Sequence, residues 1–102
     1  MLLFIPHAHS APPRCDPARK IVHIAQPAYP PVEYRVGFDA SVTLEFTILK
    51  DGEVTDAVVL ARDPPDVHDF DVPSIQAVHG SRLASSAREC RQQMKIKFVI
   101  KQ

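Results

Sequence analysis

The side chains best suited to metal binding gather near the N-terminus, where His7 and His9 precede Cys15. Imidazole and thiolate together suit soft or borderline transition metals. The remaining histidines stand at unrelated spacings, at positions His23, His68 and His79. A chain end rarely holds a metal tightly, so we interpret these histidines as exposed or hydrogen-bonded side chains. We expect no metal site and no cofactor.

A run of carboxylates, Asp63, Asp66, Asp69 and Asp71, is the second group with chemical potential. An EF-hand calcium loop needs a central glycine and a terminal bidentate glutamate, and this run has neither. Acids just before Pro73 instead suit the positive end of a helix. We interpret the run as a solvated loop and a helix start.

Enzyme signatures are missing from the sequence. There is no Gly-x-Ser-x-Gly elbow, no His-Glu-x-x-His and, with three glycines in all, no phosphate-binding glycine loop. Twelve basic residues balance twelve acidic ones, so there is no positive excess for nucleic acid. No run approaches the ~20 apolar residues that cross a bilayer. We expect a non-enzymatic chain without a membrane span or a nucleic-acid ligand.

The two cysteines, Cys15 and Cys90, are too far apart for a zinc knuckle or a Cys-x-x-Cys redox pair. One disulfide is the simplest use of them. In an oxidising compartment it would tie the N-terminal arm to the last strand and contribute roughly 4 to 5 kcal/mol through loop entropy. Two free thiols remain the alternative.

The first ten residues have some features of a signal peptide, which would indicate export from the cytoplasm. An apolar run, Met1 to Ile5, precedes Ala8-His9-Ser10, whose small residues have the spacing that a signal peptidase reads. Pro6 ends the run early and no basic residue precedes it. Residues 1–10 are therefore either the remnant of a signal peptide or a frayed chain end.

Most of the ten prolines precede residue 32, and proline fixes φ and removes a donor. We therefore predict an irregular N-terminal arm over residues 11–25, in which Ile21 to Ile24 could add a short strand. A short helix is expected within residues 29–38.

Alternating residues from Val42 to Ile48 predict a half-buried strand. Asp51-Gly52 then predicts a type I′ hairpin turn, with the returning strand ending near Ala61 and its buried face ambiguous. The pattern from Met94 to Lys101 predicts a final strand with one wet face.

A helix is predicted from about Val72 to Ala84, because apolar residues recur at three-to-four spacing. The expected stripe consists of Val72, Ile75, Val78 or His79, and Leu83. Gly80 should weaken this helix by about 1 kcal/mol relative to alanine.

These elements predict an α+β fold over residues 26–102. We expect a three-stranded antiparallel sheet with two helices packed on one face, preceded by the Pro-rich arm.

Several motifs in order resemble the TonB C-terminal domain family over roughly Gln26 to Lys101. Pro27-Ala28-Tyr29-Pro30 resembles the family's Pro-x-Tyr-Pro opening, in which Pro27, Tyr29 and Pro30 carry the match. Asp51-Gly52-Glu53-Val54 resembles its turn, and the segments that resemble its strands and second helix are Val42 to Ile48, Lys95 to Ile100 and Ser74 to Val78. The resemblance is to a divergent member, since Ala40 replaces a usual glycine and Ser81-Arg82-Leu83 an aromatic segment.

The resemblance implies a periplasmic domain that binds protein by β-augmentation, in which an extended partner segment pairs with the last strand. The implied partner is an envelope protein such as a TonB-dependent receptor. The implied partner-binding residues are Lys95, Ile96, Lys97, Phe98, Val99 and Ile100. The two lysines either favour acidic neighbours on the partner or solvate and blunt the edge. The membrane helix and Pro-rich spacer of full TonB have no counterpart here, so we expect no energy transduction by this chain alone.

Two alternatives of another class stay open. The chain could be a structural or self-associating envelope assembly domain without a transport role, forming a homodimer through the same edge. A degenerate fragment with no independent role is a third and weaker interpretation.

Overall fold

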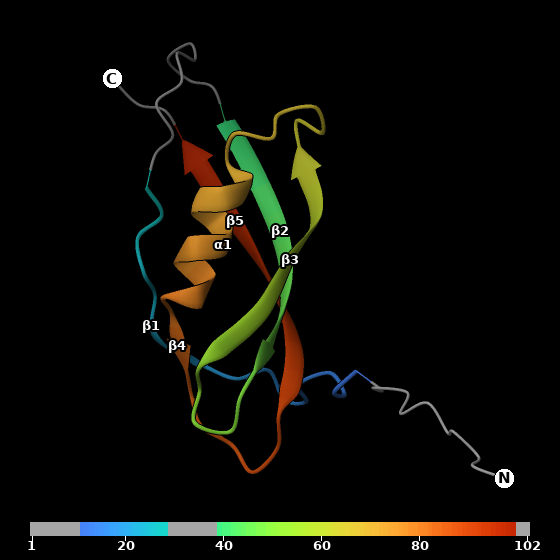
Figure 1. The fold of residues 1–102 in the computed structure, drawn as a ribbon, viewed down its shortest axis with the longest axis vertical. Helices are drawn as coiled ribbons and strands as arrows, with labels where there is room; N and C mark the ends of the chain where they lie inside the picture. The colour runs from blue at the N-terminus through green and yellow to red at the C-terminus, as the bar shows by residue number, and fades with distance from the viewer. Residues whose placement is uncertain (1–10, 29–38, 100–102) are drawn as a thin grey trace, which may run out of the picture.

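The computed structural model describes residues 11–28 and 39–99. Its elements, in chain order, are β1 (Ile21–His23), β2 (Asp39–Ile48), β3 (Val54–Asp63), α1 (Asp71–His79), β4 (Arg82–Leu83) and β5 (Cys90–Val99) (Figure 1). The expected helix within 29–38 lies outside the described residues. So do Tyr29, Pro30, Ile100 and residues 1–10.

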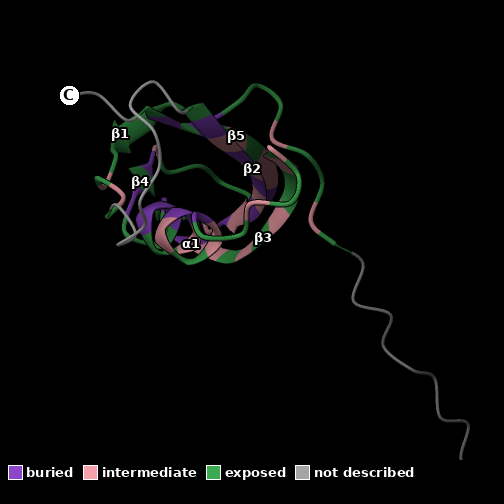
Figure 2. Ribbon diagram, turned by 90° about the horizontal axis from the view of Figure 1, so that it is seen from above, coloured by how far each residue is buried: buried purple, intermediate pink, exposed green. Residues whose placement is uncertain are grey.

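The three long strands form one antiparallel sheet in the order β3-β2-β5, which confirms the predicted α+β class and its sheet. The helix α1 covers one face and contacts β2 and β3 (Figures 1 and 2). A second sheet, β1 paired with β4, was not predicted as a sheet, although β1 falls in the segment that could add a strand. In the described part of the chain, no helix combines the length and apolar character needed to cross a membrane.

The central strand β2 builds the core through strict alternation. Its inner face consists of five buried residues: Ala40, Val42, Leu44, Phe46 and Ile48. The residues between them are half-buried on the opposite face, as the period of two requires (Figure 2). Phe98 of β5 closes the core against Phe70, with ring centroids 4.5 Å apart. The β2 pattern read from the sequence is therefore confirmed.

The hairpin joins β2 and β3 where predicted, but the type I′ turn was wrong. The Gly52 amide donates to the Leu49 carbonyl at 3.0 Å, so Lys50 and Asp51 are the central turn residues. Among the described residues only Gly52 and Asp56 have positive φ, and the value at Gly52 is +94°. A turn with negative φ at both central positions, followed by a left-handed glycine, is the three-residue hairpin loop with a G1 bulge.

The helix is shorter than predicted. It begins at Asp71, with Pro73 in its first turn as expected, but it ends at His79 with Gly80 as its cap. The predicted stripe was wrong in two places, because Val72 is exposed and Leu83 lies in β4. The buried helix residues include Ser74 and Ala77, whose small side chains allow close approach to the sheet. The Ser81 hydroxyl donates to the Ala77 carbonyl at 2.7 Å as the chain leaves the helix.

A cluster of long-range contacts holds the end of the molecule near the hairpin turn. Cys15 and Cys90 form the predicted disulfide, with their Cα atoms 4.8 Å apart. The guanidinium of Arg19, a residue only 8% exposed, donates to the carbonyls of Leu49, Ala84 and Arg88. Arg19 therefore joins the arm to the hairpin and to the loop before β5. No local pattern of residues indicated this role.

The end of β3 is held to the start of α1 by a bidentate ion pair. Arg62 donates to both carboxylate oxygens of Asp71 at 2.6 to 2.9 Å. This hydrogen bonding from Arg62 is the main reason why the pKa of the Asp71 carboxyl lies below its ordinary value of 3.8. His68, 3.7 Å away, lowers the pKa of Asp71 further, while burial opposes both.

The geometry of the turn predicts that alanine substitution destabilises the protein far more at Gly52 than at Gly80. In Gly52→Ala, the new Cβ would overlap the Leu83 carbonyl oxygen and would also strain a positive φ. We expect a loss of about 2 to 4 kcal/mol in the free energy of unfolding, measured by urea denaturation. Gly80→Ala is the control, because Gly80 has negative φ and its new Cβ would lie 3.2 Å from the Ala25 Cβ, a much milder contact than the overlap at Gly52. Equal losses in the two variants would contradict this account.

The ion pair predicts a pH-dependent effect. Because the pKa of Asp71 is lowered by folding, its contribution to stability is complete above the ordinary value of 3.8 and is lost as the pH falls below it. Asp71→Asn should therefore unfold at lower urea than the unchanged protein at pH 7, and the difference should shrink near pH 3. Asp66→Asn, which removes an exposed carboxylate, should show no such change.

Candidate functional site

The strand β5 forms one edge of the three-stranded sheet. Its ten residues pair with β2 in one unbroken antiparallel register, from Asp39 opposite Val99 to Ile48 opposite Cys90. No bulge interrupts this pairing. The edge is therefore straight enough to be continued by another strand.

One hydrogen-bonded contact shows which backbone groups of β5 point outward. The Arg91 amide donates to the Pro13 carbonyl at 2.9 Å, and the Arg91 carbonyl accepts from the Cys15 amide at 2.8 Å. Both partners belong to the arm, so the peptide groups of Arg91 face away from β2. Because these groups alternate in direction along a strand, those of Gln93, Lys95 and Lys97 face the same way.

The side chains of β5 point alternately to the two faces of the sheet. Gln93, Lys95 and Lys97 are exposed on the sheet face that α1 does not cover, whereas Ile96 and Phe98 are buried in the core. Neither lysine has an ion-pair partner among the described residues. Among the described residues, the edge thus combines outward backbone groups with two lysines, which line a hollow of about 230 Å³ together with Asp39 and Asp63 but form no ion pair with them.

The opposite edge, β3, is built differently. Its pairing with β2 shifts register twice, and Asp56 takes a positive φ of 55°. The Ala57 amide donates to the His79 Nε2 atom at 3.3 Å, so a side chain from the end of α1 occupies part of this edge. Bulges and covered donors are the devices by which edge strands avoid further pairing.

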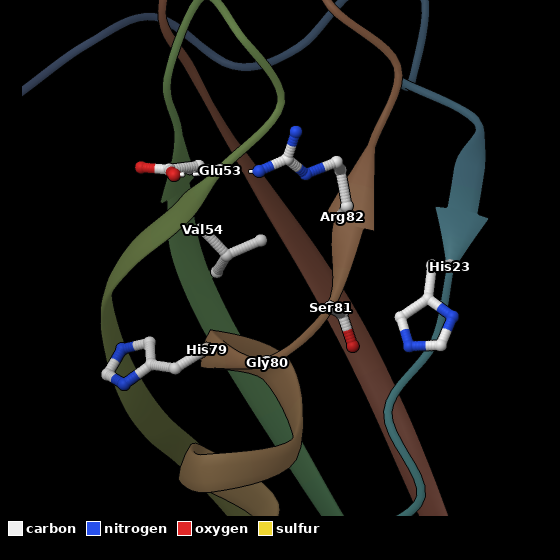
Figure 3. Close-up of a pocket in the computed structure, with 7 residues that line it drawn as sticks. All are labelled: His23, Glu53, Val54, His79, Gly80, Ser81 and Arg82. Carbon is white, nitrogen blue, oxygen red and sulfur yellow. Dashed lines mark ion pairs between the residues drawn. The ribbon is translucent and has the colours of Figure 1, made fainter.

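A hollow of about 510 Å³ lies between the start of β3 next to the hairpin turn, the end of α1 and the strands β1 and β4. It is lined by His23, Glu53, Val54, His79, Gly80, Ser81 and Arg82 (Figure 3). The two histidines lie on opposite sides of it, while Arg82 and Glu53 face each other at 3.5 Å (Figure 3). Within the described ranges, no group of histidine, cysteine and acidic residues has the arrangement of a metal site.

The residues predicted to bind a partner differ in how they are placed on β5. Lys95 and Lys97 combine an exposed side chain with an outward backbone, whereas the side chains of Ile96 and Phe98 pack inside the domain. Sequence reasoning missed Gln93, although it shares the spacing of the lysines. It also missed Arg91, whose pairing with the arm has no local sequence signal.

Comparison with known proteins adds one finding. The family model described as "Gram-negative bacterial TonB protein C-terminal" matches residues 25–101. A search of curated proteins found no match to the chain.

The edge geometry predicts alternating hydrogen exchange in the free protein. The amides of Met94 and Ile96 bond to β2 and should exchange slowly, whereas those of Gln93, Lys95 and Lys97 should exchange fast. Amide exchange followed by NMR at neutral pH measures each of them. Uniform protection from residue 93 to residue 97 would contradict an open edge.

Proposed function

This chain belongs to the family of Gram-negative bacterial TonB C-terminal domains, and from that premise we propose that it docks an extended protein segment along β5. Domains of this family act in the periplasm and bind proteins such as receptors. The proposed partner is a segment of an envelope protein, for instance an outer-membrane transporter. It adds a fourth strand to the sheet next to β5.

The observation that carries this proposal is the contrast between the two sheet edges. The edge of β5 has a continuous register and outward peptide groups at Gln93, Lys95 and Lys97. The edge of β3 is bulged and carries the His79 contact. An added strand forms its hydrogen bonds at low cost only where the template is regular. The contrast therefore favours docking on β5.

The charges along the edge favour an acidic partner over a second copy of this chain. Lys95 and Lys97 project from one face of β5 without ion-pair partners in the described part of the molecule. In a symmetric β5 to β5 pairing, the lysines of the two copies would crowd one another, and facing like charges destabilise a sheet. A partner with carboxylates at these positions would gain attraction instead.

A proline substitution at position 95 tests whether the partner binds the backbone of β5 or the lysine side chain. Lys95→Pro removes one outward amide and places ring atoms on the edge, but it removes no bond to β2. We expect it to weaken partner binding at least tenfold, roughly the worth of one hydrogen bond plus the steric block. Lys95→Ala keeps the amide and should weaken binding only a few-fold. The measurement is an NMR titration with short peptides from the periplasm-facing ends of outer-membrane receptors.

The same titration decides between outcomes. Shifts centred on residues 93–97, abolished by Lys95→Pro and retained in Lys95→Ala, support strand addition. Equal effects of the two variants would mean that the lysine charge is recognised and not the strand. A concentration-dependent dimer, detected by sedimentation without any peptide response, would favour the self-associating assembly domain.

A further inference from the structure

We propose that the N-terminal arm is a built-in stop that occupies one end of the docking edge and confines a partner to β5 from Gln93 onward. This inference rests on the proposed docking at β5 and specifies its extent. The disulfide between Cys15 and Cys90 holds the stop in place.

The arm already acts as a short strand on this edge. Pro13 and Cys15 form a parallel bridge centred on Arg14 opposite Arg91, through the two backbone hydrogen bonds given above. These bonds use the outward amide and carbonyl of Arg91, which are the groups that a docking strand would need there. A partner strand and the arm therefore cannot both pair with Arg91.

The side chain of Arg91 strengthens this contact and is itself held by Glu45 of β2. The Arg91 Nε donates to the Pro12 carbonyl at 2.8 Å, and its Nη1 donates to the Glu45 carboxylate at 3.0 Å. The arm then leaves the edge, because the Arg19 amide bonds to the Gln92 side chain and the Arg19 guanidinium is buried near the hairpin. The arm is thus fixed on both sides of its pairing with β5.

Two backbone hydrogen bonds alone would hold such an arm weakly, since the net contribution of each one in water is small. The disulfide changes this balance because it joins Cys15, which pairs with Arg91, to Cys90, the residue before Arg91. It keeps the arm next to the edge at all times. A hollow of about 190 Å³ marks the junction between the arm and the open edge, and both Cys15 and Gln93 line it.

The test uses the full 102-residue protein and two synthetic peptides of alternating valine and threonine with a glutamate at each end, five and nine residues long. In the unchanged protein both peptides should bind with equal affinity and shift only amides from Gln93 onward. With Cys15→Ser and Cys90→Ser together, only hydrogen bonds hold the arm beside Arg91, and a competing strand can displace it there. The longer peptide should then bind about tenfold tighter than the shorter one, since it gains two hydrogen bonds at Arg91.

A second variant tests the same inference if the double serine variant does not fold. Arg91→Ala keeps the disulfide but removes the side-chain bonds to Pro12 and Glu45. In this variant the amide at position 91 should exchange faster. The longer peptide should bind more tightly than the shorter one, but by less than in the double serine variant. Lys50→Ala, an exposed substitution in the hairpin turn, is the matched control and should change neither quantity.

The outcomes separate this inference from the proposed function. An Arg91 amide that exchanges as fast as that of Lys95 in the free, unchanged protein overturns the stop. The stop is also overturned if the longer peptide binds more tightly than the shorter one by the same factor in the unchanged protein and in the double serine variant. If neither peptide shifts the edge of any variant, docking on β5 itself fails, and the inference falls with it, even where Arg91 is protected.

Discussion

The unbroken pairing of β5 with β2 is the constraint on which the rest of the structure depends. It runs over ten residues, and it fixes which residues of β5 face the core and which peptide groups face outward. Ile96 and Phe98 must then pack under α1 and Phe70, while Lys95 and Lys97 must face solvent. A slip of one residue would exchange the two sets and place lysines in the core. The same register therefore stabilises the domain and defines its open edge.

The two edges of the sheet are protected from unwanted pairing in different ways. This difference leaves only β5 suited to pair with a partner. An unprotected strand edge invites unwanted pairing, so proteins bulge it, cover it or charge it. Here β3 is bulged at Asp56 and contacted by His79, and the first part of β5 is covered by the arm. Within the described residues, the part of the β5 edge that stays uncovered is a short stretch that carries two lysines. Such charge deters self-pairing and still admits an acidic strand.

Local patterns predicted the parts of the fold that local physics controls. Alternation from Val42 to Ile48 placed β2 and its buried face correctly, because a half-buried strand needs that period. The hairpin was located by Asp51-Gly52, but its turn type depends on the close packing of Gly52 against Leu83, which is remote in sequence. Leu83 matched helical spacing by coincidence. The buried role of Arg19 could not be predicted, because its partners are three carbonyls from two segments that are distant in sequence, the hairpin and the loop before β5.

The central claim is that a partner joins this domain through backbone pairing at the edge of β5. The most direct measurement is isotope-filtered NMR of the labelled domain in complex with an unlabelled receptor peptide, read as contacts between backbone protons of the two chains. We expect regularly spaced backbone contacts from the peptide to Gln93, Lys95 and Lys97. Contacts confined to side chains, to the edge of β3 or to the hollow between His23 and His79 would contradict it.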